Sequence, residues 1–239
     1  MAGAKGEASV WELDRAQRAI ARRSAEARAT IPDLDLTVEV DMEACLALPD
    51  ELPCASTALL VRASALALRQ LPRANGAYRE GRLELYSRVN VGVVLASVET
   101  YAIPTVFDAD GKSLWELGGE ISQLAARARE GELSPPELAG ATFTVSNLGP
   151  WGIGSSTPLV LAPQAAALSA GAIREIPVIR DGAIVPGHAM TLKLVCDHRI
   201  LYGAHAAMFL ARIKALMERG ATPPQPPQPR QGAPASEMP

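Results

Sequence analysis

A strand, a turn and a helix follow one another near the C-terminal end of the chain, and this succession constrains the fold more than any other feature. Residues 191–195 read as a short buried strand, and from Gly203 onward residues 204–218 repeat apolar side chains at helical spacing. We therefore predict that His198 lies on the connecting turn. A turn held by rigid elements on both sides is a common place for a catalytic group.

His198 is the candidate general base. Histidine side chains exchange protons near neutral pH, so an imidazole on such a turn can take a proton from an attacking group. The alternative is that His198, which follows Asp197, is an ordinary turn residue at the surface. Its position alone does not separate these two interpretations.

Apolar periodicity predicts further elements upstream. Helices are expected at residues 13–28, 54–71 and 114–130, strands at residues 34–42 and 89–96, and hairpins at residues 77–88 and 176–185, which turn at Glu80-Gly81 and Asp181-Gly182. Residues 133–138 form a turn that could begin another helix at Pro135 or Pro136. The composition of the last 20 residues, rich in proline, glutamine and alanine, predicts an extended tail.

Composition limits the class of protein. With 239 residues, of which 48% are hydrophobic, the chain has material for one sizeable core. The net charge of −3 is spread along the sequence without a basic stripe, so nucleic acid is not an expected partner. No stretch is long and apolar enough for a membrane span or a signal peptide, which favours a cytoplasmic protein. The three cysteines lack metal-type spacing and are predicted to be reduced and mostly buried, Cys196 pointing into the core.

A second informative stretch lies in residues 141–149. It enters a Ser-Asn pair and a Gly-Pro-Trp-Gly turn, which places Ser146 and Asn147 at a strand end. There the Ser146 hydroxyl can point at a reacting atom, although serine at a strand end is also a common turn former.

Several segments together resemble the catalytic domain of the dihydrolipoamide acyltransferases of 2-oxoacid dehydrogenase complexes, distant relatives of chloramphenicol acetyltransferase. The segment from Asp197 to Ala204 is similar to that family's His-x-x-x-Asp-Gly signature, and residues 143–149 resemble its Phe-Thr-Ile-Ser-Asn-Leu-Gly segment. Residues 13–41 are similar to its opening helix, Ile-Pro turn and first strand, and residues 159–172 to a later strand. Two such motifs in the right order and at the right separation are more specific than either alone.

The resemblance implies an α/β fold of the chloramphenicol acetyltransferase type, in which a mixed β-sheet is backed by helices. It also implies a homotrimer with each active site between protomers. The expected domains are a flexible N-terminus at residues 1–12, a catalytic domain at residues 13–219 and a proline-rich disordered tail at residues 220–239.

By the same resemblance, His198 takes the proton of the acceptor as it attacks acyl-CoA, most simply acetyl-CoA, and the Ser146 hydroxyl stabilises the tetrahedral oxyanion without a covalent acyl-enzyme. Asn147, Asp197, Tyr202 and Gly203 are expected to support these two residues, and no metal is expected. Tyr202 departs from the pattern, which has an acidic residue there. A phenol offers only a neutral hydrogen bond in place of an ion pair.

The sequence gives less information about the acceptor, the molecule that receives the acyl group. Only about a dozen residues precede the predicted domain, so a covalently bound lipoyl group is not expected on the chain, and its polar tail favours a free trimer. A stand-alone domain resembles acyltransferases of bacterial natural-product biosynthesis. We therefore predict acetyl transfer to a hydroxyl of a small polyketide intermediate, such as a tetronate primary alcohol, in antibiotic biosynthesis. The alternatives are S-acyl transfer to a lipoyl group on another protein and, because of Tyr202, a non-catalytic trimeric scaffold.

Overall fold

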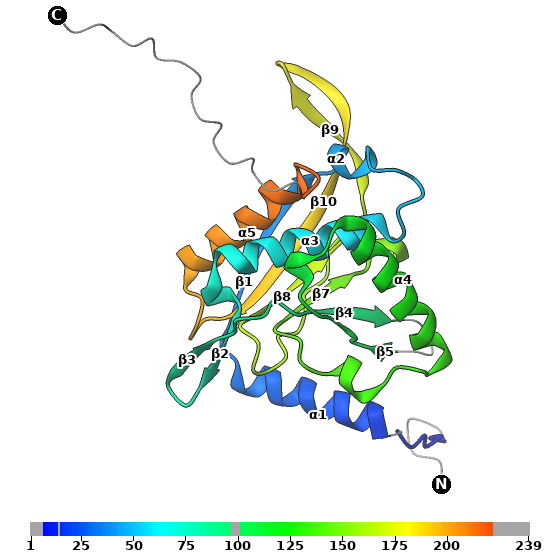
Figure 1. The fold of residues 1–239 in the computed structure, drawn as a ribbon, viewed down its shortest axis with the longest axis vertical. Coiled ribbons are helices and arrows are strands. Elements are labelled where there is room, and N and C mark those ends of the chain that lie inside the picture. The colour runs from blue at the N-terminus through cyan, green and yellow to red at the C-terminus, as the bar shows by residue number, and fades with distance from the viewer. Residues whose placement is uncertain (1–6, 14, 97–100, 222–239) are drawn as a thin grey trace, which may run out of the picture.

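The computed structural model describes residues 7–13, 15–96 and 101–221. Helices and strands are mixed along the chain, as Figure 1 shows. In chain order the elements are α1 (Arg15–Thr30), β1 (Asp33–Asp41), α2 (Glu43–Leu46), α3 (Ala55–Gln70), β2 (Gly76–Arg79), β3 (Arg82–Leu85), β4 (Val91–Ala96), β5 (Tyr101–Ala102), β6 (Thr105–Val106), α4 (Leu114–Glu130), β7 (Phe143–Asn147), β8 (Ala166–Ala170), β9 (Arg174–Arg180), β10 (Ala183–Asp197) and α5 (Gly203–Met217). Short 3-10 turns are η1 (Pro72–Ala74), η2 (Ala109–Gly111), η3 (Pro135–Leu138) and η4 (Gly149–Trp151).

A mixed sheet forms the centre of the molecule. Its strands lie in the order β1, β10, β8, β7, β4 and β5, while β6 pairs with β4 and β9 pairs with β10. The strand β7 runs parallel to β4 and β8, and the other pairs in this sheet are antiparallel. The predicted mixed sheet backed by helices is confirmed.

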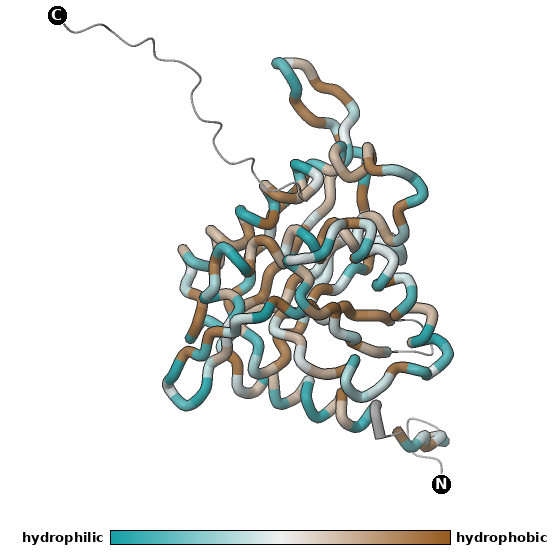
Figure 2. The backbone as a smooth tube through the Cα atoms, in the orientation of Figure 1, coloured by the Kyte–Doolittle hydropathy of each residue, from teal (hydrophilic) through white to brown (hydrophobic). Residues whose placement is uncertain are grey.

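Helices cover the two faces of this sheet unequally. Side chains alternate between the faces along each strand. Phe143 and Leu194 belong to the large core with α3, α4 and α5, where the rings of Phe143 and Phe209 meet edge to face at 5.7 Å. Ala167 and Val195 point the other way and pack with α1. In Figure 1 α1 lies apart from α3 and α5, and Figure 2 shows hydrophobic colour along β4 in the interior.

Local sequence explains where several elements begin and end. The helix α4 begins after Ser113, whose hydroxyl accepts from the Glu116 amide in a capping box, and it ends at Gly131 with φ of 72°. Its bounds are the predicted ones. The predicted hairpin turn is formed by Glu80 and Gly81, whose φ values of 48° and 80° suit a tight turn between antiparallel strands.

Other predicted bounds are wrong. The strand expected at residues 159–172 is only β8, because residues 161–164 form a turn in which the Gln164 amide donates to the Leu161 carbonyl at 2.9 Å. Pro163 in that turn has no N–H for a sheet ladder. The strand expected at residues 191–195 is the end of the much longer β10, which also supplies one arm of the hairpin with β9.

Most remaining predictions concern burial and the termini. Cys45 and Cys196 are buried and Cys54 is exposed, all three without disulfides. Among the described residues, no helix combines the length and the hydropathy needed to cross a bilayer. The proline-rich tail predicted for residues 220–239 lies outside the described residues from residue 222 onward, as does the N-terminus up to residue 6.

Candidate active site

His198 lies on the predicted turn between β10 and α5. Its backbone N–H donates to the Pro32 carbonyl at 2.9 Å, and the amides of Ile200 and Leu201 both donate to the Asp197 carbonyl at 2.9 Å. These bonds close the turn tightly and leave the His198 residue exposed. An exposed imidazole on a fixed backbone is able to meet a reactant that approaches from outside the chain.

The carboxylate of Asp197 forms hydrogen bonds with Arg199 in the turn and none with the His198 imidazole. Asp197 is 2% exposed, and its oxygens accept from the Arg199 backbone N–H at 2.9 Å and from the Arg199 guanidinium at 2.6 Å and 2.9 Å. The hydrogen bond to Asp197 raises the pKa of Arg199. The Arg199 guanidinium also lies 4.2 Å from the centre of the Tyr78 ring. The expected support from Asp197 is therefore indirect, through the shape of the turn.

Tyr202 and Gly203 begin α5 beside the histidine. The Tyr202 and His198 rings meet at 5.8 Å between centroids, with 68° between their planes. Tyr202 is the residue before the first helical turn, and Gly203 is the first residue of α5. A Cβ placed on Gly203 would have no described atom within 4 Å, so packing within the chain does not require glycine there.

Ser146 and Asn147 end β7, as predicted, and they point to opposite faces of the sheet. Asn147 faces α3, where its Nδ2 donates to the Thr57 hydroxyl at 3.0 Å, while its Oδ1 accepts from the Gly149 amide at 2.9 Å. Asn147 is thereby fixed in place. Ser146 is half-buried on the other face, and its hydroxyl makes no hydrogen bond with the residues that the structure describes.

The structure does not bring Ser146 and His198 together within one chain. Ser146 is level with Ser169 of β8, which is in turn level with Lys193 of β10. The end of β10 is about four residues further on, so Ser146 and Asp197 are separated by ~13 Å along the strands and ~10 Å across them. A hydroxyl and an imidazole this far apart cannot act on the same carbonyl.

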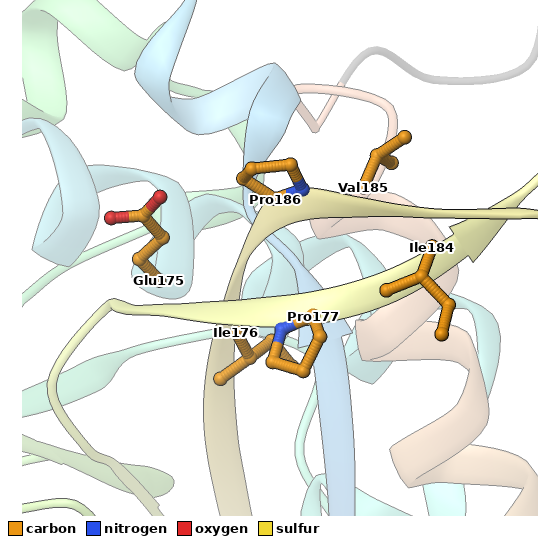
Figure 3. A pocket seen from close by; sticks show the side chains of 6 residues that line it. All are labelled: Glu175, Ile176, Pro177, Ile184, Val185 and Pro186. Carbon is orange, nitrogen blue, oxygen red and sulfur yellow. The ribbon is translucent and has the colours of Figure 1, made fainter.

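Two cavities lie away from the histidine. One of about 200 Å³ adjoins Asn147 and is bordered by β4, α4, the start of α3 and η4, with Arg129 as its cation and Cys54, Thr57 and Trp151 among its lining. The other, of about 350 Å³, lies on the β9–β10 hairpin and is lined by Glu175 and apolar side chains (Figure 3). This hairpin is at the opposite end of β10 from His198, ~45 Å along an extended strand.

Two further observations limit the chemistry. Burial, together with the nearby charge of Asp197, raises the pKa of the Cys196 thiol to about 12, so this cysteine is not a nucleophile at neutral pH. Within residues 7–13, 15–96 and 101–221 no group of three or more histidine, cysteine, aspartate or glutamate side chains is placed to hold a metal ion.

Sequence reasoning missed several residues around these positions. Arg73, which lies over the Tyr202 ring, comes from a segment more than a hundred residues upstream, and no sequence signal marks it. Thr57, Arg129 and Trp151 meet at the cavity beside Asn147 only through packing of α3, α4 and η4. The proline before Arg73 predicts the end of a helix, but it does not predict which distant residues Arg73 contacts.

Comparison with known proteins places the chain in the class of acyltransferases. A family model described as "2-oxoacid dehydrogenases acyltransferase (catalytic domain)" matches residues 5–223, and the chain belongs to this family. The dihydrolipoyllysine-residue acetyltransferase component of the pyruvate dehydrogenase complex of Zymomonas mobilis is 35% identical over 217 residues, which cover 87% of this chain and 49% of that protein. The chain thus spans about half the length of the curated relatives it matches.

Solved structures agree with this assignment. A probable dihydrolipoamide acetyltransferase from Listeria monocytogenes superposes with a TM-score of 0.85 at 30% identity, covering 91% of this chain and 97% of the other. The dihydrolipoamide acetyltransferase of Azotobacter vinelandii gives a TM-score of 0.85 at 28% identity, covering 90% and 93%. The Azotobacter vinelandii structure comes from crystallographic and enzymatic investigations on the role of one serine, one histidine and one asparagine in the catalytic mechanism of that enzyme.

These comparisons correct the predicted acceptor. The prediction of O-acyl transfer to a natural-product hydroxyl in antibiotic biosynthesis is wrong, because the relatives are acyltransferases named for dihydrolipoyl groups. Their likeness favours the S-acyl alternative. The prediction of an acyltransferase of this family is confirmed.

Proposed function

We propose that the chain is a dihydrolipoamide S-acyltransferase, which exchanges an acyl group, most simply acetyl, between coenzyme A and a dihydrolipoyl group carried by another protein domain. One observation carries the assignment of roles. The serine, histidine and asparagine investigated in the Azotobacter vinelandii enzyme are spaced along its chain as Ser146, His198 and Tyr202 are spaced here. The serine and histidine are retained, whereas a tyrosine stands at the position of the asparagine.

The reaction uses these two side chains without a covalent enzyme intermediate. A ring nitrogen of His198 takes the proton of the attacking thiol, and the resulting sulfur attacks the thioester carbonyl carbon. The Ser146 hydroxyl donates a hydrogen bond to the oxyanion that forms. When the tetrahedral intermediate collapses, the second thiolate leaves and takes the proton back from the imidazolium, so atoms and charge balance.

The separation of Ser146 from His198 makes a second copy of the chain part of the site. Each copy presents an exposed His198 at one end of β10 and a half-buried Ser146 two strands away, about four residues along the sheet from that end. If a neighbouring copy brings its Ser146 to His198, every contact between copies completes one site. A closed ring such as a trimer satisfies this requirement for all copies at once.

The test is turnover of acetyl-CoA with dihydrolipoamide, followed by chromatographic separation of coenzyme A and S-acetyldihydrolipoamide. We expect His198→Asn to lower kcat about a thousandfold, within the usual contribution of a general base. His188→Asn is the matched control, because His188 lies far along β10 and pairs with Glu43 at 3.1 Å. Absence of product with wild type, or equal rates for wild type and His198→Asn, would reject the proposal.

A further inference from the structure

The imidazole of His198 is held by a ring and not by hydrogen bonds. Neither of its ring nitrogens has a hydrogen-bond partner among the described residues, and the hydrogen bond to Pro32 comes from the backbone. The side chain instead makes an edge-to-face approach to Tyr202, with 5.8 Å between centroids. Such pairs have a preferred geometry that restricts both rings.

Tyr202 is itself fixed from the other side. The Arg73 guanidinium carbon lies 5.1 Å from the centre of the Tyr202 ring, in the range of a cation–π contact. The Nε of Arg73 donates to the Ile200 carbonyl, which anchors the guanidinium to the turn that carries His198. The His205 ring is 5.7 Å from the Tyr202 ring, at 59° between planes.

The hydroxyl of Tyr202 has no part in this arrangement. It forms no hydrogen bond with the residues that the structure describes, and 49% of the residue is exposed. An asparagine, which stands at the corresponding spacing in the Azotobacter vinelandii enzyme, has a side-chain amide and no aromatic ring. The ring contact between Tyr202 and His198 therefore has no counterpart in an asparagine at this position.

We propose that Tyr202 is a positioning residue that orients the imidazole of His198 through its aromatic ring, with Arg73 holding that ring in place. The chain thus has, in place of a polar side chain at this position, a series of contacts from Arg73 through the Tyr202 ring to the His198 ring. The catalytic consequence rests on the proposed function, in which His198 is the base. The contact itself does not depend on it.

The experiment compares Tyr202→Phe, Tyr202→Leu and Tyr202→Asn in the acetyl-CoA and dihydrolipoamide assay. Tyr202→Phe keeps the ring and should leave kcat and KM unchanged. Tyr202→Leu and Tyr202→Asn should lower kcat about tenfold and leave KM for both substrates almost unchanged, because orientation of the base and not substrate binding is lost. Trp115→Leu is the matched control, since Trp115 is 52% exposed and lies at the start of α4, on the opposite face of the sheet from Ser146.

A second readout does not require activity. The imidazole proton resonances of His198, assigned by their loss in His198→Asn, should be displaced by the Tyr202 ring current in wild type and in Tyr202→Phe. In Tyr202→Leu they should return toward those of an exposed histidine, and Arg73→Gln should shift them partway. Thermal unfolding of each variant separates a local effect from loss of the fold.

Three results would overturn the inference. A kcat for Tyr202→Phe as low as that for Tyr202→Leu would assign the effect to the hydroxyl. Recovery of wild-type kcat by Tyr202→Asn would assign it to hydrogen bonding. Unchanged His198 resonances in Tyr202→Leu would show that the rings do not meet in solution. If His198→Asn were fully active, the proposed function would fail, and the resonances alone would then decide whether the contact exists.

Discussion

The end of β7 and the end of β10 carry the two candidate catalytic side chains in contrasting ways. At the β7 end, hydrogen bonds and close backbone approaches fix the chain around Ser146, through Asn147, Gly149 and Thr57. At the β10 end, the backbone of the turn is fixed but the imidazole of His198 is held by ring contacts and is open to solvent. Under the proposed function, a donor for an oxyanion must be in place before reaction, whereas a base must stay open to two thiols in turn. The difference in support between the two ends agrees with this proposal.

Removing the Ser146 hydroxyl tests the β7 end of this comparison. Ser146→Ala should lower kcat about a hundredfold, ~3 kcal/mol of transition-state stabilisation, with a smaller change in KM. Steady-state kinetics with acetyl-CoA and dihydrolipoamide measure this. The exposed Ser122 on α4 supplies the control Ser122→Ala, which should behave as wild type. Equal kcat for both variants would remove Ser146 from the mechanism.

Glycine substitutions near the end of β7 and the end of β10 should change the free energy of unfolding by different amounts. A Cβ on Gly171, beside the β7 end, would overlap the Gly154 carbonyl oxygen, whereas one on Gly203 would have no described atom within 4 Å. Gly171→Ala should therefore lower the free energy of unfolding by about 3 kcal/mol, the upper part of the usual cost of overpacking. Gly203→Ala should leave it unchanged or slightly raised, because alanine favours a helix.

Denaturant unfolding of both variants beside wild type makes this measurement. Equal stabilities for Gly171→Ala and wild type would mean that the close approach between residues 154 and 171 is not present in solution.

Local features of the fold are predictable from the sequence, and long-range ones are not. The capping box at Ser113 and the glycine at residue 131 set the bounds of α4, and Glu80-Gly81 sets a hairpin turn, because neighbouring residues decide these structures. The resemblance implies a strand at residues 159–172, yet residues 161–164, which include Pro163, form a turn and only β8 is a strand. The length of β10 depends on partners from β1, β8 and β9, which no local pattern contains.

In the candidate site, too, local features are predictable from the sequence and long-range contacts are not. The positions of His198 on a turn and Ser146 at a strand end follow from local patterns and are confirmed by the structure. Their separation across the sheet follows from the register of three strands, and the contact between Arg73 and Tyr202 follows from packing of distant segments. The predicted acceptor is wrong, because features near the chain ends carry no information about the thiol or hydroxyl that enters the site.

The central claim is that His198 and Ser146 of different copies form one site, and mixing of inactive copies tests it most directly. His198→Ala and Ser146→Ala chains, given different affinity tags, are co-expressed, and assemblies that carry both tags are purified. In a mixed assembly, a copy with intact His198 can face a copy with intact Ser146. For random assembly into trimers the preparation before tag selection should regain about a quarter of wild-type kcat. Mixed assemblies no more active than the two single variants would contradict the account, because sites contained within one chain cannot be restored by mixing.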